Sequence, residues 1–217
     1  MRRVLAIVVL GMTGLAGAAS AQTAAASADR GYVEVGIQSA FGNVTTQAFS
    51  GEFGMTIHPN LQVFVEGGAI RDVATPETGA AAQSIAGSLS QTQSNVTYTV
   101  RQPVTFGVGG VKFEVPTSSV VRPYVLGGFG IANVRQDVSF AVGGTDVTSS
   151  LQPQFGVTLG TDLSGSFTKP MVVVGGGAMF RPGSRLVLDL QFRYGHIMAD
   201  DGGINVSRAG IGVGVRF

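Results

Sequence analysis

The sequence contains no cysteine and no tryptophan, and it has few charged residues. Charged side chains make up 12% of the 217 residues, against about 25% in an ordinary soluble domain. Without cysteine, disulfides contribute nothing to stability, even in an oxidising compartment. The mean hydropathy is +0.32, a value typical of membrane proteins.

A long hydrophobic run is also missing. The longest apolar run, from Val4 to Leu10, extends weakly to Leu15, whereas a membrane-spanning helix needs about 20 apolar residues. In lipid, only helices and closed β-barrels pair all of their backbone polar groups. The apolar residues must therefore fill a soluble core or alternate along strands, and the spanning structure that remains is a barrel.

The first 21 residues have the pattern of an export signal. Arg2 and Arg3 precede the apolar run, and Ala19-Ser20-Ala21 places small residues at a cleavage position. This pattern is typical of a secretory signal peptide. We expect a signal peptide at residues 1–21, cleavage after Ala21 and a mature domain at residues 22–217. A retained anchor helix is the alternative.

Cleavage also changes the charge balance. Loss of both arginines leaves 12 basic and 13 acidic residues, so the net charge becomes −1. No basic excess remains to attract nucleic acid, and the sequence predicts no nucleic-acid partner.

Glycine is abundant, with 33 residues that mostly lie inside apolar stretches of period two. This period indicates strands with one apolar face and one polar or small face, and glycine suits the crowded interior of a narrow barrel. The sequence predicts an all-β fold, an eight-stranded antiparallel up-and-down transmembrane β-barrel. Its expected strands are 31–42, 48–58, 61–72, 101–115, 123–135, 169–181, 185–198 and 205–217.

The connections between these strands alternate in length. Residues 73–100 and 136–168 form long connections, whereas the intervening ones are short, as expected for external loops and periplasmic turns. Both termini then fall on the periplasmic side. Within 101–115, the apolar face changes phase near Gly109-Gly110, which predicts a bulge there. Ten strands are the alternative, if 137–142 and 155–163 pair as a hairpin.

Three segments carry a family resemblance. Arg122 to Gly130 reads RPYVLGGFG, Leu188 to Gly195 reads LDLQFRYG, and the chain ends in an aromatic residue, Phe217. The sequence resembles the small outer-membrane β-barrels of the OmpA transmembrane-domain, OmpX and opacity-protein type. The resemblance implies a location in the bacterial outer membrane and a monomeric barrel. It also implies contact with outer-membrane lipids, including lipopolysaccharide, and insertion by periplasmic chaperones and the barrel-assembly machinery, with Phe217 as the assembly signal.

Charged residues on the polar faces form the main candidate cluster. Arginine or lysine facing lipid at mid-depth costs about 2–4 kcal/mol, so we expect these side chains to point into the lumen. An eight-stranded barrel is just wide enough to be filled by side chains, and bidentate arginine–carboxylate pairs would suit that interior. The expected structural ion network comprises Glu34, Glu52, Glu66, Asp189, Arg193, Arg208 and Arg216. An ion path or an acid–base pair is the alternative.

Other candidate sites are weaker. His196 with Ser207 and Asp200 or Asp201 could form a hydrolytic triad, but no motif supports it. Asp200, Asp201, Asp162 and Asp146 could bind a cation at the outer rim, without the spacing of a known loop. A girdle of aromatic residues at the membrane interfaces is expected from Tyr32, Tyr124, Tyr194, Phe41, Phe53 and Phe217.

The leading functional hypothesis is a non-enzymatic barrel without cofactor, catalytic or metal site. Its role would be envelope-structural or surface interaction through the loops at 73–100 and 136–168, because binding residues commonly lie on loops of a rigid scaffold. The alternatives are a small-solute channel, a lipid-modifying enzyme, and a soluble β-sandwich or lipocalin-like binder.

Overall fold

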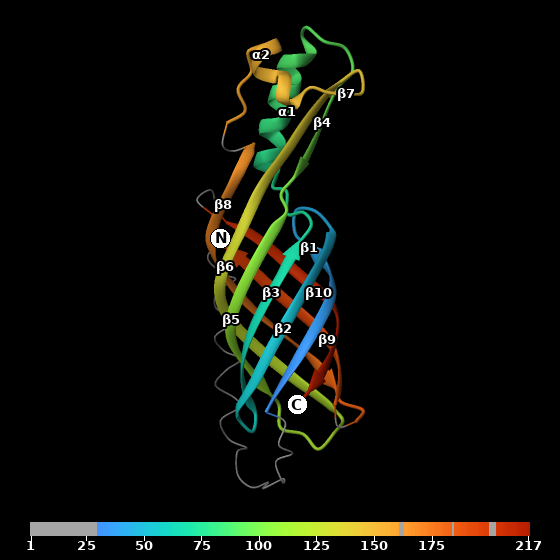
Figure 1. Cartoon of the computed structure of the whole chain (residues 1–217), viewed down its shortest axis with the longest axis vertical. Coiled ribbons are helices and arrows are strands. Elements are labelled where there is room, and N and C mark those ends of the chain that lie inside the picture. The colour runs from blue at the N-terminus through green and yellow to red at the C-terminus, as the bar shows by residue number, and fades with distance from the viewer. Residues whose placement is uncertain (1–29, 161–162, 184, 200–202) are drawn as a thin grey trace, which may run out of the picture.

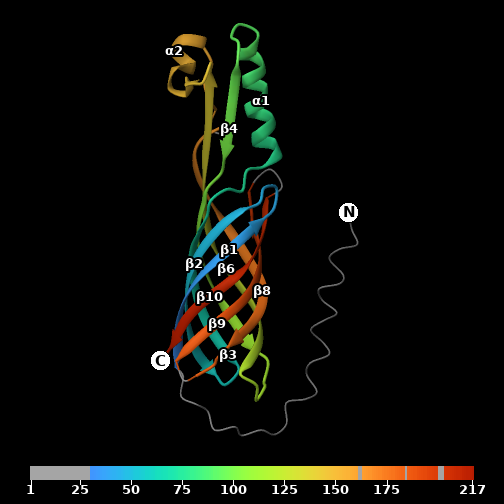
Figure 2. The ribbon, with the colours of Figure 1, turned by 90° about the vertical axis from the view of Figure 1, so that its right-hand side faces the viewer.

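Eight strands of alternating polarity close into a barrel, and a smaller head stands on one of its ends (Figures 1 and 2). The computed structural model describes residues 30–160, 163–183, 185–199 and 203–217. No helix within these ranges is long and apolar enough to cross a membrane. The barrel strands are β1 (Gly31–Phe41), β2 (Thr46–His58), β3 (Leu61–Ile70), β5 (Val104–Glu114), β6 (Val121–Val142), β8 (Ser164–Phe180), β9 (Leu186–Ile197) and β10 (Ile204–Arg216).

Every barrel strand pairs antiparallel with two neighbours, and β1 closes the ring against β10. The backbone N–H of Arg30 donates to the carbonyl of Phe217 at 2.8 Å, so the two ends of the barrel sequence meet. The same end carries the turns β2–β3, β5–β6 and β8–β9, and we call it the turn end. The opposite end, which carries the head, is the head end. The predicted eight-stranded barrel is confirmed.

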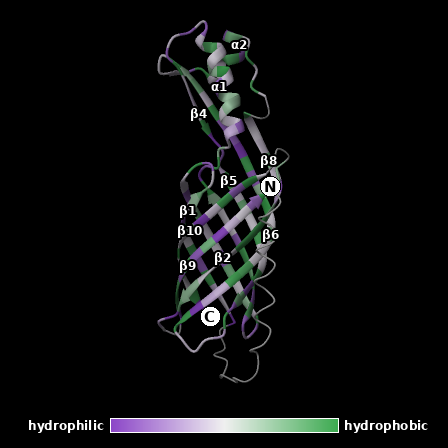
Figure 3. Ribbon diagram, turned by 180° about the vertical axis from the view of Figure 1, so that it is seen from behind, coloured by the Kyte–Doolittle hydropathy of each residue, from purple (hydrophilic) through white to green (hydrophobic). Residues whose placement is uncertain are grey.

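Side chains alternate between the lumen and the outer surface along each strand. Hydrophobic and hydrophilic residues accordingly alternate in colour along the strands of the ribbon (Figure 3). On β1, Val35 and Ile37 face outward, whereas Glu34 and Gln38 are buried in the lumen. Glycine makes room inside: a Cβ on Gly54 would lie 2.1 Å from the Tyr32 ring, and one on Gly212 would lie 2.0 Å from Glu34 Oε1. Large lumen side chains therefore lie over glycines of neighbouring strands.

The bulge predicted at Gly109-Gly110 is wrong. Pairing of β5 with β3 and with β6 continues through both glycines without a shift. What changes along β5 is the chemistry of its faces. Its lumen side passes from Val104, Phe106 and Val108 to Lys112 and Glu114, so the apolar residues change face while the register stays constant.

The head is built from segments that the sequence predicts as external loops. It comprises α1 (Pro76–Ser90), β4 (Val96–Arg101), the part of β6 from Asp137, and residues 143–160 with β7 (Thr145–Asp146), a 3-10 turn (Thr148–Ser150) and α2 (Leu151–Phe155). Thr75 caps α1, and Pro76 occupies its first turn, where a missing N–H costs nothing. A second apolar core forms beneath α1 from Ala82, Ala86, Leu89, Val138, Phe140, Leu151 and Leu163.

The ten-strand alternative is also wrong. Residues 137–142 continue β6 and pair with β4, and residues 156–160 form no strand. The pairing of β6 with β7 turns at Gly143 and Gly144, whose φ angles are +58° and +83°. Two left-handed residues are what a tight hairpin requires, and β4 and β7 both lie outside the barrel ring.

Candidate functional site: the lumen and the pocket at its head end

A network of charged side chains fills the lumen toward the turn end. We call it the lumen network, and its members are Glu34, Glu52, Glu66, Lys112, Asp189, Arg193 and Arg208, all buried. Their strands alternate, so every second residue points inward, and inward glycines leave room for the long side chains. Facing inward spares these charges contact with lipid.

Glu52 and Glu66 receive most of the positive charge. Lys112 Nζ lies 2.5 Å from Glu52 Oε1, and the Arg193 guanidinium bridges Glu52 Oε2 at 2.6 Å and Glu66 Oε2 at 2.7 Å. Arg208 contacts both oxygens of Glu66 at 3.0 and 3.4 Å. A bidentate pair of this kind fixes geometry as well as charge, so the network is a rigid filling.

Aromatic rings complete this filling. The Tyr32 hydroxyl donates to Glu52, and the Tyr124 hydroxyl donates to Asp189 Oδ2 at 2.7 Å. Lys112 Nζ lies 4.5 Å from the centre of the Tyr124 ring and 4.8 Å from that of Tyr32, within the range of cation–π attraction. The prediction that these tyrosines belong to an interface girdle is wrong: they are 2% and 3% exposed and lie in the lumen.

Glu34 and Asp189 are less completely paired. Gln191 Nε2 donates to Glu34 Oε1 at 3.1 Å, but Glu34 Oε2 and Asp189 Oδ1 have no hydrogen-bond partner in the described part of the chain. The lumen network thus holds four carboxylates and three cations, and the three cations form their ion pairs with Glu52 and Glu66 rather than with this pair.

Arg216 lies apart from the network. It has the inward parity of β10, but it sits at the turn end, where its Nη2 donates to the carbonyl of Gly183 at 2.5 Å.

A second cluster forms at this end around Glu114, which accepts from Gln62 Nε2 at 2.7 Å and pairs with Arg181. Lys112, Glu114 and Arg181 are absent from the network expected from the sequence. The alternation of Lys112 and Glu114 with Val111, Phe113 and Val115 is the signal that could have revealed the first two.

An apolar layer separates the lumen network from the head. Buried side chains at the head-facing ends of the strands form it, including Ile70, Val104, Met171, Ile197 and Ile204. Arg208 touches this layer, with its Cζ 4.4 Å from the centre of the Phe106 ring. Ion pairs therefore fill the lumen toward the turn end, and apolar side chains fill it toward the head end.

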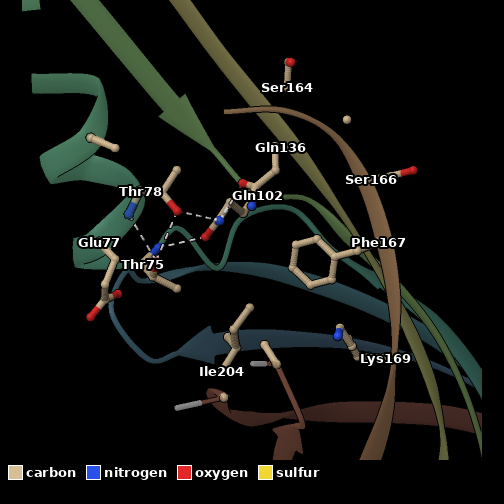
Figure 4. Close-up of a pocket in the computed structure, with 14 residues that line it drawn as sticks. Thr75, Glu77, Thr78, Gln102, Gln136, Ser164, Ser166, Phe167, Lys169 and Ile204 are labelled. Carbon is tan, nitrogen blue, oxygen red and sulfur yellow. Dashed lines mark hydrogen bonds between the residues drawn. The ribbon is translucent and has the colours of Figure 1, made fainter. Parts of the chain in front are cut away.

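A pocket of about 500 Å³ lies above this layer, between the barrel and the head. We call it the mouth pocket, and Figure 4 draws its described lining residues and labels most of them. The lining residues are Thr75, Glu77, Thr78, Ala81, Gln102, Gln136, Ser164, Gly165, Ser166, Phe167, Lys169, Ala199, Gly203 and Ile204. They come from the start of α1 and its cap, the connection between β4 and β5, the middle of β6, the start of β8, and the connection before β10 with the first residue of β10. The pocket therefore lies where the head meets the barrel.

Gln102 joins the walls of this pocket. Its Oε1 accepts from the Thr75 N–H at 2.8 Å, and its Nε2 donates to Thr78 Oγ1 at 2.8 Å and to Gln136 Oε1 at 2.6 Å (Figure 4). One buried amide therefore connects the first turn of α1 to β6. Because both its amide oxygen and its amide nitrogen are hydrogen-bonded within the protein, we interpret Gln102 as a residue that holds the pocket walls together rather than one that contacts a ligand.

The predicted hydrolytic group does not assemble in the described residues. His196 Nδ1 lies 2.7 Å from Asn205 Oδ1, which also accepts from the Tyr194 hydroxyl at 2.7 Å. Ser207 is instead opposite Tyr194 in the register. Asp162, Asp200, Asp201 and Ala21 lie outside the described residues. Asp146 is described at the tip of the head, and no group of metal-ligating side chains occurs in the described ranges.

The other four aromatic residues expected in the interface girdle lie on the outer face of the barrel. Phe41, Phe53, Tyr194 and Phe217 are exposed on the outer surface. The Phe217 ring stacks on Phe53, with centroids 6.2 Å apart. Phe217 thus stands at the turn end of an outward face, and its role in assembly stays a prediction.

A family model described as an outer membrane protein beta-barrel domain matches residues 12–217. The chain belongs to this family. Its place in the bacterial outer membrane follows from the family and from the closed barrel with an apolar outer face. No curated protein shows a significant sequence match.

Solved structures of other outer-membrane proteins are similar to this chain. Neisserial surface protein A, NspA, is 15% identical, with 86% of this chain and 96% of that chain covered and a TM-score of 0.51. The attachment invasion locus protein Ail of Yersinia pestis is 15% identical over 87% and 99% of the chains, with a TM-score of 0.48. The N-terminal barrel of Pseudomonas aeruginosa OprF is 15% identical over 87% and 99%, at 0.46. At this identity, the likeness to NspA shows the fold alone.

Proposed function

We propose that this protein is a non-enzymatic outer-membrane barrel whose head recognises a ligand at the cell surface. The single observation that carries the proposal is the mouth pocket, which forms where the head meets a filled barrel. Short turns of such barrels face the periplasm and long connections face outward, so we infer that the head and its pocket lie outside the cell. A rigid scaffold that presents a structured extension is a common arrangement for binding.

The filled lumen supports recognition over transport. Arg193, Arg208 and Lys112 are at most 1% exposed, and an apolar layer lies between them and the pocket. A small-solute channel would need both layers to open. Planar-bilayer recordings that show steady conductance by the native protein would favour the channel alternative.

An enzymatic role has less support. His196 is oriented by Asn205, and no nucleophile of the described residues is bonded to it. A lipid-modifying enzyme would need such a pair. Lipid A mass spectra that differ between cells with the wild-type protein and cells with His196→Ala would overturn this part of the proposal.

The remaining partners are also proposals. The exposed aliphatic and aromatic side chains of the outer face, such as Val35, Ile37 and Phe129, suit contact with outer-membrane lipids, including lipopolysaccharide. Insertion would use periplasmic chaperones and the barrel-assembly machinery, with Phe217 as the signal. We propose a monomer, since a closed ring leaves no barrel strand edge unpaired.

A headless variant tests the function. Residues 75–100 and 137–163 would be replaced by short Gly-Ser loops, leaving the eight strands of the barrel, and heat-modifiable gel mobility would show that the barrel still closes. Cells with equal surface amounts of the two proteins are compared for adhesion to immobilised glycans, to matrix proteins and to each other. We expect the wild type to add adhesion to at least one surface and the headless protein to lose it. Equal adhesion to every surface would refute recognition by the head.

A further inference from the structure

The walls of the mouth pocket have a specific chemistry. Polar and apolar residues share the described lining about equally, and its uncharged hydrogen-bonding side chains are those of Thr75, Thr78, Gln102, Gln136, Ser164 and Ser166. One aromatic ring, Phe167, stands among them. Of the described lining residues, Glu77 is the one carboxylate and Lys169 the one cation, so the charges balance within the described part of the lining.

This chemistry disfavours several ligand classes. A fatty acyl chain would need a mainly apolar pocket, because buried polar groups without partners are costly. A nucleotide or a polyphosphate would need several cations, whereas the described lining supplies Lys169. The volume of about 500 Å³ lies within the range of about 300–1,000 Å³ that is usual for small ligands.

Two polar groups of the lining are available for a ligand. Gln136 Oε1 is held by Gln102, which leaves the Gln136 Nε2 group as a donor without a hydrogen bond to the described residues. The Glu77 carboxylate, in the first turn of α1, likewise makes no ion pair with them. A donor amide and an acceptor carboxylate on separate walls match a ligand that carries several hydroxyl groups.

The aromatic ring of Phe167 offers an apolar surface to a ligand that the polar walls can hydrogen-bond. Phe167 projects from β8 toward α1, with Gln136 on one side of it and Lys169 on the other (Figure 4). The ring is partly buried against the apolar layer of the barrel, so it is held in place. A sugar ring has one face of C–H groups and a rim of hydroxyls, and it could lie on Phe167 while its rim reaches the polar walls.

We propose that the mouth pocket binds a short, uncharged saccharide. The C–H face of one sugar ring packs on Phe167, Gln136 Nε2 donates to a ring hydroxyl, and Glu77 accepts from another. This inference rests on the proposed function, since it names the ligand class of the same head. Two sources share this chemistry, the sugars of the cell's own lipopolysaccharide and free or foreign glycans.

Titration calorimetry on the full-length protein, folded in detergent free of lipopolysaccharide, tests the inference. The probes are glucose-, mannose- and galactose-based trisaccharides and the delipidated core oligosaccharide of lipopolysaccharide. We expect at least one probe to bind and Phe167→Ala to weaken it at least tenfold. Phe167→Leu, which keeps apolar contact with the barrel, should also weaken it, and Gln136→Ala should do so about fivefold.

Gln83→Ala is the matched control, because Gln83 is exposed on α1 outside the pocket lining and the change should leave affinity unchanged. Binding of the core oligosaccharide alone identifies the cell's own lipopolysaccharide as the source, and binding of a trisaccharide alone identifies a free or foreign glycan. Absence of binding by every probe, or binding that Phe167→Leu and Phe167→Ala leave intact, overturns the inference. If head-dependent adhesion persists in that case, the proposed function survives; if adhesion is also absent, both fail.

Discussion

Along β6, even-numbered side chains line the barrel lumen from Tyr124 to Val134 and the head core at Val138 and Phe140. One face of one strand thus serves two interiors that are stabilised differently. The lumen buries ion pairs inside a ring of backbone hydrogen bonds, whereas the head buries alanine, leucine and phenylalanine under a single helix. The closed barrel sheet therefore accommodates buried ion pairs, whereas the small head core is built from apolar side chains.

The largest expected effect concerns the lumen. Glu52→Ala leaves Lys112 without its ion pair and Arg193 with Glu66 alone, and leaving a buried charge unpaired costs about 3–5 kcal/mol. Urea unfolding of the protein in detergent should show a loss of this size. Glu34→Gln is the matched control and should cost much less, because the three cations of the lumen network pair with Glu52 and Glu66 and not with Glu34. Equal losses for the two variants would mean that the pairing described here does not stabilise the barrel.

The next effect should be confined to the head. Leu89 is buried in the head core, and a Leu→Ala change in a core costs about 2–5 kcal/mol. We expect Leu89→Ala to expose α1 to limited proteolysis while the heat-modifiable mobility of the barrel is unchanged. Ser84→Ala, on the exposed side of α1, is the control. A barrel that loses heat-modifiability together with the head would show that the two interiors are one cooperative unit.

Glycine substitutions sharpen the difference between the two faces of the barrel. A Cβ on Gly54 would lie 2.1 Å from the Tyr32 ring in the lumen, whereas one on Gly107, on the outer face, meets nothing within 4 Å. Overpacking costs about 1–3 kcal/mol, so Gly54→Ala should lower the unfolding free energy in urea by that amount. Gly107→Ala should leave it unchanged or raise it slightly, and a loss there would contradict the assigned faces.

The smallest effect is expected at the tip of the head. Asp146 Oδ1 accepts from the Thr148 N–H at 2.8 Å, and hydrogen bonds from Thr148 hold the pKa of this exposed carboxyl below its usual value. Because the folded pKa is depressed, the contact stabilises the tip above the unfolded pKa and is lost as pH falls through the folded one. The protection factor of the Thr148 amide, which is corrected for the pH dependence of intrinsic exchange, should therefore fall in acid, and Asp146→Ala should remove that fall.

The helix of the head carries sequence signals that a reading in terms of strands misses. Thr75-Pro76-Glu77 is a helix start with a cap, an N1 proline and an acidic first turn, and the buried Thr78, Ala82, Ala86 and Leu89 follow helical spacing. The extension of β6 was also readable, since Val134, Val138 and Phe140 keep its period. The pairing of β4 with this extension could not be predicted from the sequence. Which strands pair depends on the tertiary structure, because the two segments are far apart in the chain.

What the sequence by itself determined is the barrel: eight alternating segments, their outward apolar faces and the inward parity of Glu34, Glu52, Glu66, Asp189, Arg193 and Arg208. Period two is a local property of a strand, so it survives without knowledge of neighbours. The tertiary structure alone decided which charges meet, that Tyr124 turns inward, that β5 keeps its register, and that Gln102 joins head to barrel. These depend on register and on contacts between strands far apart in the chain, which no local pattern records.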